Sequence, residues 1–147
     1  MIRRISATLL AAASLLGAGA ALAAPAQAAS CTIQNACLYS DGNFTGHKRD
    51  DLYSRTNWGN ITYDGTSIPL YQGDGVINNV SSIDNWDPDT RVSVFYNSAY
   101  AGPCFKIAAY GSASNLGNIN IGVGSSANDK MNSHKFGDAC VGNMYDF

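Results

Sequence analysis

The sequence predicts an all-β protein in which two Greek-key motifs form a β-sandwich. Residues 39–46 and 95–102 share one pattern: an aromatic residue, four others, a second aromatic residue, one spacer and a glycine. Two later segments recur in the same order, which indicates a duplicated supersecondary unit. Glutamate is absent and Gly, Asn, Ser and Tyr are plentiful, a composition that favours strands and turns over helices. The later pairs are 57–61 with 115–119 and 78–82 with 128–133.

Each aromatic pair predicts a folded-over hairpin at the start of its repeat. The two rings can stack across the turn, while the glycine adopts a backbone conformation that a Cβ atom disfavours. Neither half can bury its apolar face alone, so we expect the two repeats to share one core. The motif residues are Tyr39, Phe44 and Gly46 in the first repeat and Phe95, Tyr100 and Gly102 in the second.

Apolar and polar residues alternate at 91–96 and 118–123, which predicts two half-buried strands. Turn signals place further strands at 37–39 and 104–108. Residues 87–89, Asp-Pro-Asp, are the expected connector between the repeats. The predicted core residues are Leu38, Ile61, Leu70, Ile83, Val94, Ile107, Ile119 and Ile121.

The first 28 residues have the features of a secretory signal peptide. Arg3 and Arg4 precede an apolar run over 5–24, and 26–28 is an Ala-Gln-Ala cleavage signal. An uncleaved membrane anchor is the alternative that the length of the run allows. We expect an extracellular chain, residues 29–147, that forms a single domain with no membrane segment. Repeat one spans about 31–86 and repeat two about 91–147.

Composition argues against several classes of function. The net charge of −2 becomes −4 once Arg3 and Arg4 are removed, because all eleven acidic residues are aspartates further along the chain. No basic patch indicates nucleic-acid binding. The chain lacks a G-x-S-x-G motif and the paired glutamates typical of glycosidases, so no catalytic residues are assigned. His47 and His134 fit no zinc spacing, and we expect both at exposed strand positions.

An even number of cysteines in an exported chain favours two disulfides over metal binding. Three connectivities are open to Cys31, Cys37, Cys104 and Cys140. A local pair, Cys31 with Cys37, would hold the start of the domain to the first hairpin. The other pair, Cys104 with Cys140, would hold the second hairpin to the C-terminal segment.

The paired motifs resemble the signature of the βγ-crystallin fold. Because the chain also has an export signal and an early Cys-x5-Cys, it is similar to a family of small secreted actinobacterial metalloproteinase inhibitors. The resemblance implies a monomeric, non-enzymatic peptidase inhibitor whose partner is an extracellular protease. In the characterised inhibitors the protease-facing loop is held by a disulfide between cysteines close in sequence, which Cys104 and Cys140 are not. No reactive bond is therefore assigned, and the candidate loops are 53–75 and 87–90.

The resemblance also raises the prospect of calcium. In calcium-binding relatives, the polar segment late in each repeat supplies oxygen ligands. Asn128, Asp129 and Ser81 would form one weak site here, while Ile77 and Asn78 disrupt the second. The alternative is that these residues only close turns. We expect no required cofactor, and a calcium-stabilised structural role is one alternative to inhibition.

Another alternative is a killer-toxin-like module that binds cell-wall glycan. Tyr53, Trp58, Tyr63 and Tyr71 lie in a Gly- and Asn-rich stretch that is longer in the first repeat than in the second. If their rings are exposed on one face, they can stack on sugars or bind a partner protein. Otherwise they cover the sheets.

Overall fold

The computed structural model describes residues 30–122 and 126–145, so the predicted signal peptide lies outside the described residues. This part of the chain is all-β, with short 3₁₀ turns and no α-helix, as predicted. The strands are β1 (Ala36–Asp41), β2 (Thr45–Asp51), β3 (Ser82–Asn85), β4 (Val92–Asn97), β5 (Ala101–Ile107), β6 (Ser112–Ala113), β7 (Ser133–Phe136) and β8 (Met144–Tyr145). The 3₁₀ turns are η1 (Trp58–Asn60) and η2 (Leu116–Asn118).

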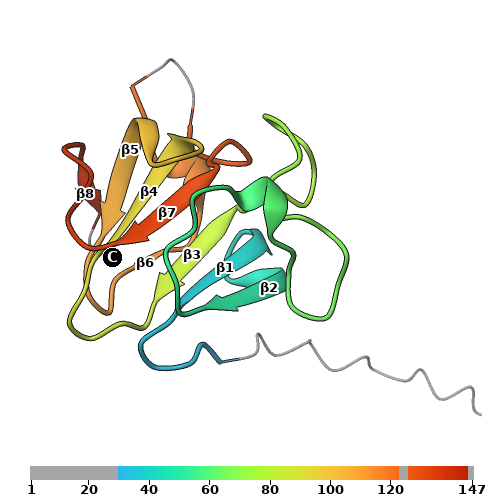
Figure 1. The fold of residues 1–147 in the computed structure, drawn as a ribbon, viewed down its shortest axis with the longest axis horizontal. Helices are drawn as coiled ribbons and strands as arrows, with labels where there is room; N and C mark the ends of the chain where they lie inside the picture. Colours follow the sequence, from blue (N-terminus) through green and yellow to red (C-terminus); the bar gives the residue numbers. More distant parts are fainter. Residues whose placement is uncertain (1–29, 123–125, 146–147) are drawn as a thin grey trace, which may run out of the picture.

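The strands form two four-stranded sheets, in the orders β2-β1-β3-β6 and β7-β4-β5-β8 (Figure 1). β6 comes from the second repeat but pairs with β3 of the first sheet. Conversely, Arg55 of the first repeat pairs with His134 at the outer edge of β7. Each repeat thus contributes a segment to the other's sheet, and the predicted pair of Greek-key motifs is confirmed.

The two hairpins have nearly the same geometry. Tyr39 and Phe44 have ring centroids 5.8 Å apart, and so do Phe95 and Tyr100. The following glycines, at positions 46 and 102, have φ values of +79° and +78°. The predicted contact between the rings and the predicted glycine conformation are therefore both confirmed.

A buried serine closes each hairpin from the last main strand of the same repeat. Ser82 Oγ donates to the carbonyl of Asp41 at 2.6 Å and accepts from the Phe44 N–H at 3.1 Å. Ser133 Oγ makes the equivalent bonds at 2.7 and 3.2 Å in the second repeat. These hydroxyls satisfy backbone groups that the bulged turn removes from the β ladder.

Gly102→Ala is expected to lower the free energy of unfolding by about 1–2 kcal/mol, because an alanine there must adopt a left-handed φ. Its Cβ would also lie 2.7 Å from Asn97 Nδ2. Gly42→Ala is the matched control: Gly42 lies outside the left-handed region and the nearest atom to its added Cβ, Ser114 O, is 3.6 Å away. Denaturant unfolding of both variants measures the difference, and equal losses would contradict the role given to the glycine.

One hydrophobic core lies between the sheets. All eight predicted core residues belong to it, with Ile61 partly buried and packed against the rest. The prediction that β4 is half-buried is wrong, since both faces of its first four residues are buried. Ser93 Oγ donates to the Gly137 carbonyl and accepts from the N–H groups of Ala139 and Cys140, so the segment after β7 covers the second face.

The strand predicted at 118–123 is also wrong. Asn118 ends η2, and beyond it the pairing is a single bridge between Asn120 and Ser126. Ile119 and Ile121 are nevertheless buried, and Asn120 is exposed. The alternation of apolar and polar residues therefore predicted the buried side chains correctly, although the segment pairs with another segment only at the Asn120 bridge. Val123 lies outside the described residues.

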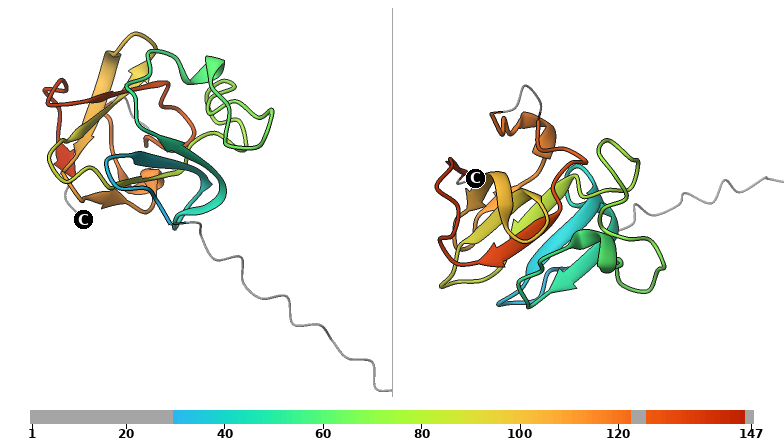
Figure 2. Two further views of the ribbon diagram at one scale, coloured as in Figure 1. Left: turned by 60° about the horizontal axis from the view of Figure 1, so that its bottom comes forward. Right: turned by 45° about the horizontal axis from the view of Figure 1, so that its top comes forward.

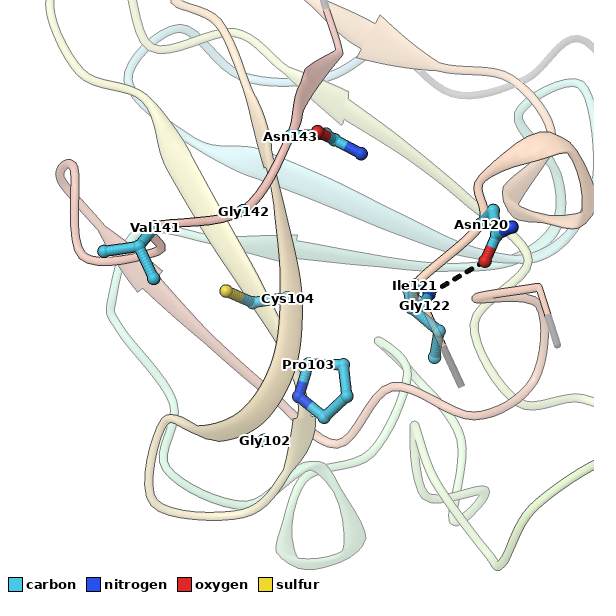
Figure 3. A pocket seen from close by; sticks show the side chains of 9 residues that line it. All are labelled: Gly102, Pro103, Cys104, Asn120, Ile121, Gly122, Val141, Gly142 and Asn143. Carbon is cyan, nitrogen blue, oxygen red and sulfur yellow. Dashed lines mark hydrogen bonds between the residues drawn. The ribbon is translucent and has the colours of Figure 1, made fainter. Parts of the chain in front are cut away.

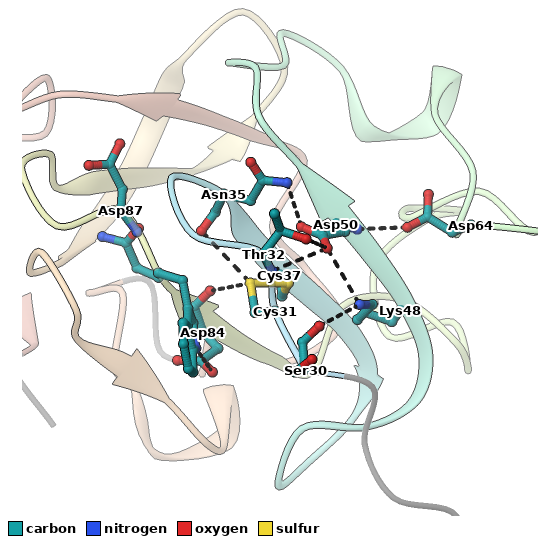
Figure 4. Close-up of a disulfide and its surroundings, with 12 residues drawn as sticks. Ser30, Cys31, Thr32, Asn35, Cys37, Lys48, Asp50, Asp64, Asp84 and Asp87 are labelled. Atoms are coloured by element: carbon teal, nitrogen blue, oxygen red, sulfur yellow. Dashed lines mark hydrogen bonds and ion pairs between the residues drawn. A yellow bond between two sulfur atoms is a disulfide. The ribbon is translucent and has the colours of Figure 1, made fainter.

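The disulfides join Cys31 to Cys37 and Cys104 to Cys140. The first holds the turn before β1 against that strand, where Asp50 of β2 accepts hydrogen bonds from Thr32 and Asn35 (Figure 4). The second holds β5 to the segment after β7. Within the described ranges, no helix has the length and apolar character needed to cross a membrane.

Candidate functional site

Exposed apolar side chains gather around the connector between the repeats. Of the seven large hydrophobic side chains that are exposed in the described part of the chain, five lie at this end. The backbone joins the segments: the Gln34 N–H donates to the Trp86 carbonyl, and the Tyr110 N–H donates to the Asp87 carbonyl. We call this surface the connector face; its connector loop, between β3 and β4, is at the lower left of Figure 1. The connector face comprises Ile33, Leu52, Tyr53, residues 86–90 and Tyr110.

An open cleft of about 500 Å³ crosses the connector face. It brings together the start of one candidate loop, 53–75, and Asp87, Asp89 and Thr90 of the other, 87–90. The sequence left the two loops as alternatives, whereas the structure places parts of both at one site. Its lining residues are Gln34, Leu52, Tyr53, Ser54, Asp87, Asp89, Thr90 and Phe136.

The connector wall of this cleft is held in one conformation. Asp87 Oδ1 accepts from the N–H groups of Asp89 and Thr90, both at 2.9 Å. The buried Asn85 amide donates to the carbonyls of Thr90 and Ala108 at 2.9 and 2.7 Å. A turn fixed in this way loses little conformational entropy when a partner binds.

The opposite wall is anchored by an ion pair between the partly exposed Arg55 and the buried Asp51. Arg55 contacts the Asp51 carboxylate through Nε at 2.8 and 3.0 Å and through Nη2 at 2.7 Å. The Tyr53 N–H also donates to Asp51 at 3.2 Å. Burial alone would raise the pKa of Asp51, but the hydrogen bonds from Arg55 and Tyr53 and the surrounding charges keep it below its usual value. Tyr53 is therefore held at its backbone while its ring is 62% exposed.

His134 holds the same wall from inside, and the prediction that it is exposed is wrong. Trp58 Nε1 donates to His134 Nδ1 at 2.9 Å, and His134 Nε2 lies 3.0 Å from the Tyr53 carbonyl oxygen. Because an indole nitrogen can only donate, Nδ1 must accept and Nε2 must carry the proton. The fully buried ring is thus neutral, and burial lowers its pKa to about 4 despite the nearby Asp51 carboxylate.

Stability is expected to fall as pH drops from 6.5 towards about 4, the unfolded and folded pKa values of His134. Between these pH values the unfolded chain binds a proton at His134 and the folded chain does not. The free energy of unfolding therefore falls by on the order of 3 kcal/mol in total. Denaturant unfolding at a series of pH values measures the loss. His134→Gln is the control, because its amide can accept from Trp58 and donate to Tyr53 without titrating. The same loss in the variant would contradict the assignment.

The four aromatic residues predicted to form one partner-binding face do not do so. Trp58 and Tyr63 are fully buried, which makes that prediction wrong for both. Tyr63 reaches across the loop to donate to the Asn78 carbonyl at 2.9 Å. Tyr71 is half-buried, and only Tyr53 is largely exposed. Trp58 and Tyr63 thus join Leu70 of the same segment in the hydrophobic core, where their rings bury a large apolar area.

The rest of the 53–75 candidate loop, green in Figure 2, is held to β4 and to the segment before β7 by hydrogen bonds. Asp74 accepts hydrogen bonds from the hydroxyls of Tyr71 and of Tyr96 on β4. Burial and the Asp74 carboxylate together raise the pKa of Tyr71 to about 12. The buried Asn79 amide donates to the carbonyls of Gly73 and Asp129. These bonds place a second rigid loop at the end opposite the connector.

The predicted calcium ligands do come together. Ser81 Oγ donates to Asp129 Oδ1 at 2.8 Å, and Asn128 Nδ2 donates to Asp129 Oδ2 at 2.6 Å. Burial raises the pKa of Asp129. One carboxylate and one hydroxyl are compatible with a weak calcium site, although calcium takes at least six oxygens. Calcium binding stays a prediction, and a melting temperature that rises with calcium and falls with chelator would support it.

Two other places offer less chemistry. The Sγ atoms of Cys31 and Cys37 lie near an Asp50 oxygen, but both are consumed in a disulfide (Figure 4). A second open cleft, about 440 Å³, lies beside Cys104, and none of its lining residues titrates (Figure 3). It is lined by Gly102, Pro103, Cys104, Asn120, Ile121, Gly122, Val141, Gly142 and Asn143.

Solved structures that resemble this one include βγ-crystallin domains. One comes from work on the evolution of the eye lens βγ-crystallin domain fold. It is 16% identical in sequence, with a TM-score of 0.56, and the match covers 74% of this chain and 90% of that one. The N-terminal domain of protein S is 18% identical, with a TM-score of 0.48 over 73% and 99%. A βγ-crystallin from Ciona intestinalis is 21% identical, with a TM-score of 0.44 over 69% and 98%.

No curated protein matches the sequence. Residues 24–107, however, match the sequence profile of peptidase inhibitor family I36. This range includes both hairpins, η1 and the connector, and it covers more than half of the chain. The chain therefore belongs to peptidase inhibitor family I36.

Proposed function

We propose that the chain is secreted and acts as a monomeric inhibitor that binds an extracellular peptidase without catalysis of its own. The observation that carries this proposal is the family match over 24–107. The matched range contains the connector 86–90 together with Leu52 and Tyr53, the exposed residues that face it across the cleft. Two disulfides support an extracellular setting, because such bonds persist in oxidising compartments.

The chemistry of the described residues supports binding rather than catalysis. A nucleophile needs an accessible base and an orienting group. His134 is buried between Trp58 and the Tyr53 carbonyl, and its two nitrogens are both occupied. The four cysteines are oxidised. His47 is exposed on β2, as predicted. The connector turn lies beside exposed apolar side chains, which suits tight association with little ordering cost.

A zinc endopeptidase is the target class we put first, because the sequence resembles metalloproteinase inhibitors. Purified chain 29–147 should be titrated against a thermolysin-type zinc peptidase and a subtilisin-type serine peptidase. The expected result is a linear loss of zinc-peptidase activity up to one equivalent, with the inhibitor chain recovered intact. Loss of neither activity at micromolar inhibitor would contradict the proposal, and so would cleavage of the inhibitor as an ordinary substrate.

A further inference from the structure

The cleft of the connector face has two chemically different walls. Tyr53 and Phe136 contribute aromatic rings on one side, while Asp87 and Asp89 contribute carboxylates on the other. Gln34, Ser54 and Thr90 add hydrogen-bonding groups between them. A cleft of this composition attracts a cation that also has an apolar or planar surface.

Both carboxylates have oxygens available for a partner. Within the described part of the chain, the Asp89 carboxylate makes no hydrogen bond or ion pair. Asp87 uses Oδ1 to accept from the backbone of its own turn, and its Oδ2 has no partner among the same residues. The backbone of the turn is held by these bonds before anything binds, and both residues line the cleft, so Asp87 Oδ2 and the exposed Asp89 carboxylate can accept from a partner that enters it.

The aromatic wall already binds one cation. Arg55 Cζ lies 5.4 Å from the centroid of the Tyr53 ring. Its charge is neutralised by Asp51, which is fully buried. Tyr53 remains 62% exposed despite this contact. A second planar cation can therefore contact the remaining ring surface with little repulsion from Arg55.

We propose that this cleft receives an arginine side chain from the rim of the target peptidase. The inference rests on the proposed function and deepens it, since it names the surface and the chemistry of the partner. A guanidinium group is planar, stacks on aromatic rings and bonds carboxylates through a fork of N–H donors, whereas lysine offers only a point charge. The net negative charge of the chain is complementary to such a basic rim.

A partner that fills the cleft would also cover exposed apolar side chains around it. Leu52, which lines the cleft, is 48% exposed, and Trp86, next to the lining residue Asp87, is 37% exposed. Exposed apolar groups around a charged contact exclude water from it when the partner closes over them, which strengthens the charged hydrogen bonds at the centre.

The cleft can be tested without a peptidase. Nα-acetyl-arginine amide, titrated into the isotope-labelled chain, is expected to shift backbone NMR signals at Gln34, residues 52–54 and residues 87–90. The citrulline analogue, which has the same shape without the charge, is expected to shift them far less. Equal effects of the two probes, or shifts located elsewhere, would overturn the inference.

Two variants carry the same test to the inhibitor. The double variant Asp87→Asn and Asp89→Asn keeps the turn, because an asparagine Oδ1 can still accept from the backbone, and removes both charges. It should abolish the arginine-specific shifts and weaken inhibition by about tenfold or more. Tyr53→Ala should act similarly. Ile77→Ala is the matched control, since Ile77 is 79% exposed but is not part of the connector face. This variant should change inhibition by about twofold at most.

The outcomes separate the two proposals. If the chain inhibits a peptidase but the charge and Tyr53 variants inhibit equally well, the cleft inference is wrong and the proposed function stands. If the cleft binds the arginine probe selectively but no peptidase is inhibited, the proposed function is wrong and the cleft remains a guanidinium site.

Discussion

Replacing Trp58 with alanine is expected to destabilise the chain by about 3–5 kcal/mol, because it leaves a large cavity in the core. Trp58 is fully buried, and its indole N–H is the donor to His134 Nδ1. The variant also leaves that buried nitrogen without its partner, which adds a desolvation cost. Since Trp58 comes from the first repeat and His134 from the second, the loss should weaken the contact between the repeats. Denaturant unfolding measures it.

Trp86→Ala is the matched control for this prediction. Trp86 is 37% exposed, and its indole N–H donates to Asp84 at 2.6 Å on the surface. Its removal should cost about 1 kcal/mol, the net value of one such hydrogen bond. If both tryptophan variants lost the same stability, Trp58 would not have the central packing role described above.

Removing the disulfide between Cys104 and Cys140 by replacing both residues with alanine is expected to cost about 4 kcal/mol, because the bond closes a long loop in the unfolded chain. The two cysteines are 36 positions apart. The pair Cys31 and Cys37 is separated by only 6 positions, and its removal should cost about 2 kcal/mol by the same entropy model.

The two disulfide variants control each other, since each removes one bond from the same fold. Unfolding of both variants under identical conditions gives the difference directly. A larger loss for the Cys31 and Cys37 pair would show that local contacts near Asp50, rather than loop entropy, decide the value of these bonds.

The fold could be predicted well because its signals are local and repeated. The aromatic and glycine positions of each hairpin depend on a turn of a few residues, and they recur with the same φ and ring distance. Three of the core residues, Val94, Ile119 and Ile121, were predicted from alternation, which reports burial. The same alternation failed to give pairing at Asn120, because whether a buried segment finds a neighbouring strand depends on the rest of the chain.

The environment of individual polar and aromatic residues was less predictable. Trp58, Tyr63 and Tyr53 stand in one Gly- and Asn-rich stretch, yet the first two are fully buried and the third is exposed. His134 lies on a strand next to an exposed lysine, and only the contact with Trp58 reveals why it is buried. These partners are 76 positions apart, so no local pattern contains both.

The cleft of the connector face was the hardest feature to predict, because four separate segments line it. Gln34, residues 52–54, residues 87–90 and Phe136 each lie next to the end of a strand. The sequence indicated two of these segments as separate candidate loops. The segments meet because the start of β1 pairs with the end of β3 in one sheet, and the start of β4 pairs with the end of β7 in the other.

The account requires that the inhibitor bind its peptidase through the connector face. Amide hydrogen exchange, measured on the mature chain alone and with one equivalent of inhibited peptidase, tests this most directly. We predict slower exchange in the complex at residues 52–54 and 86–90, with the loop around Ile77 unchanged. Protection confined to that loop, or to the cleft beside Cys104, with none at the connector, would contradict the account.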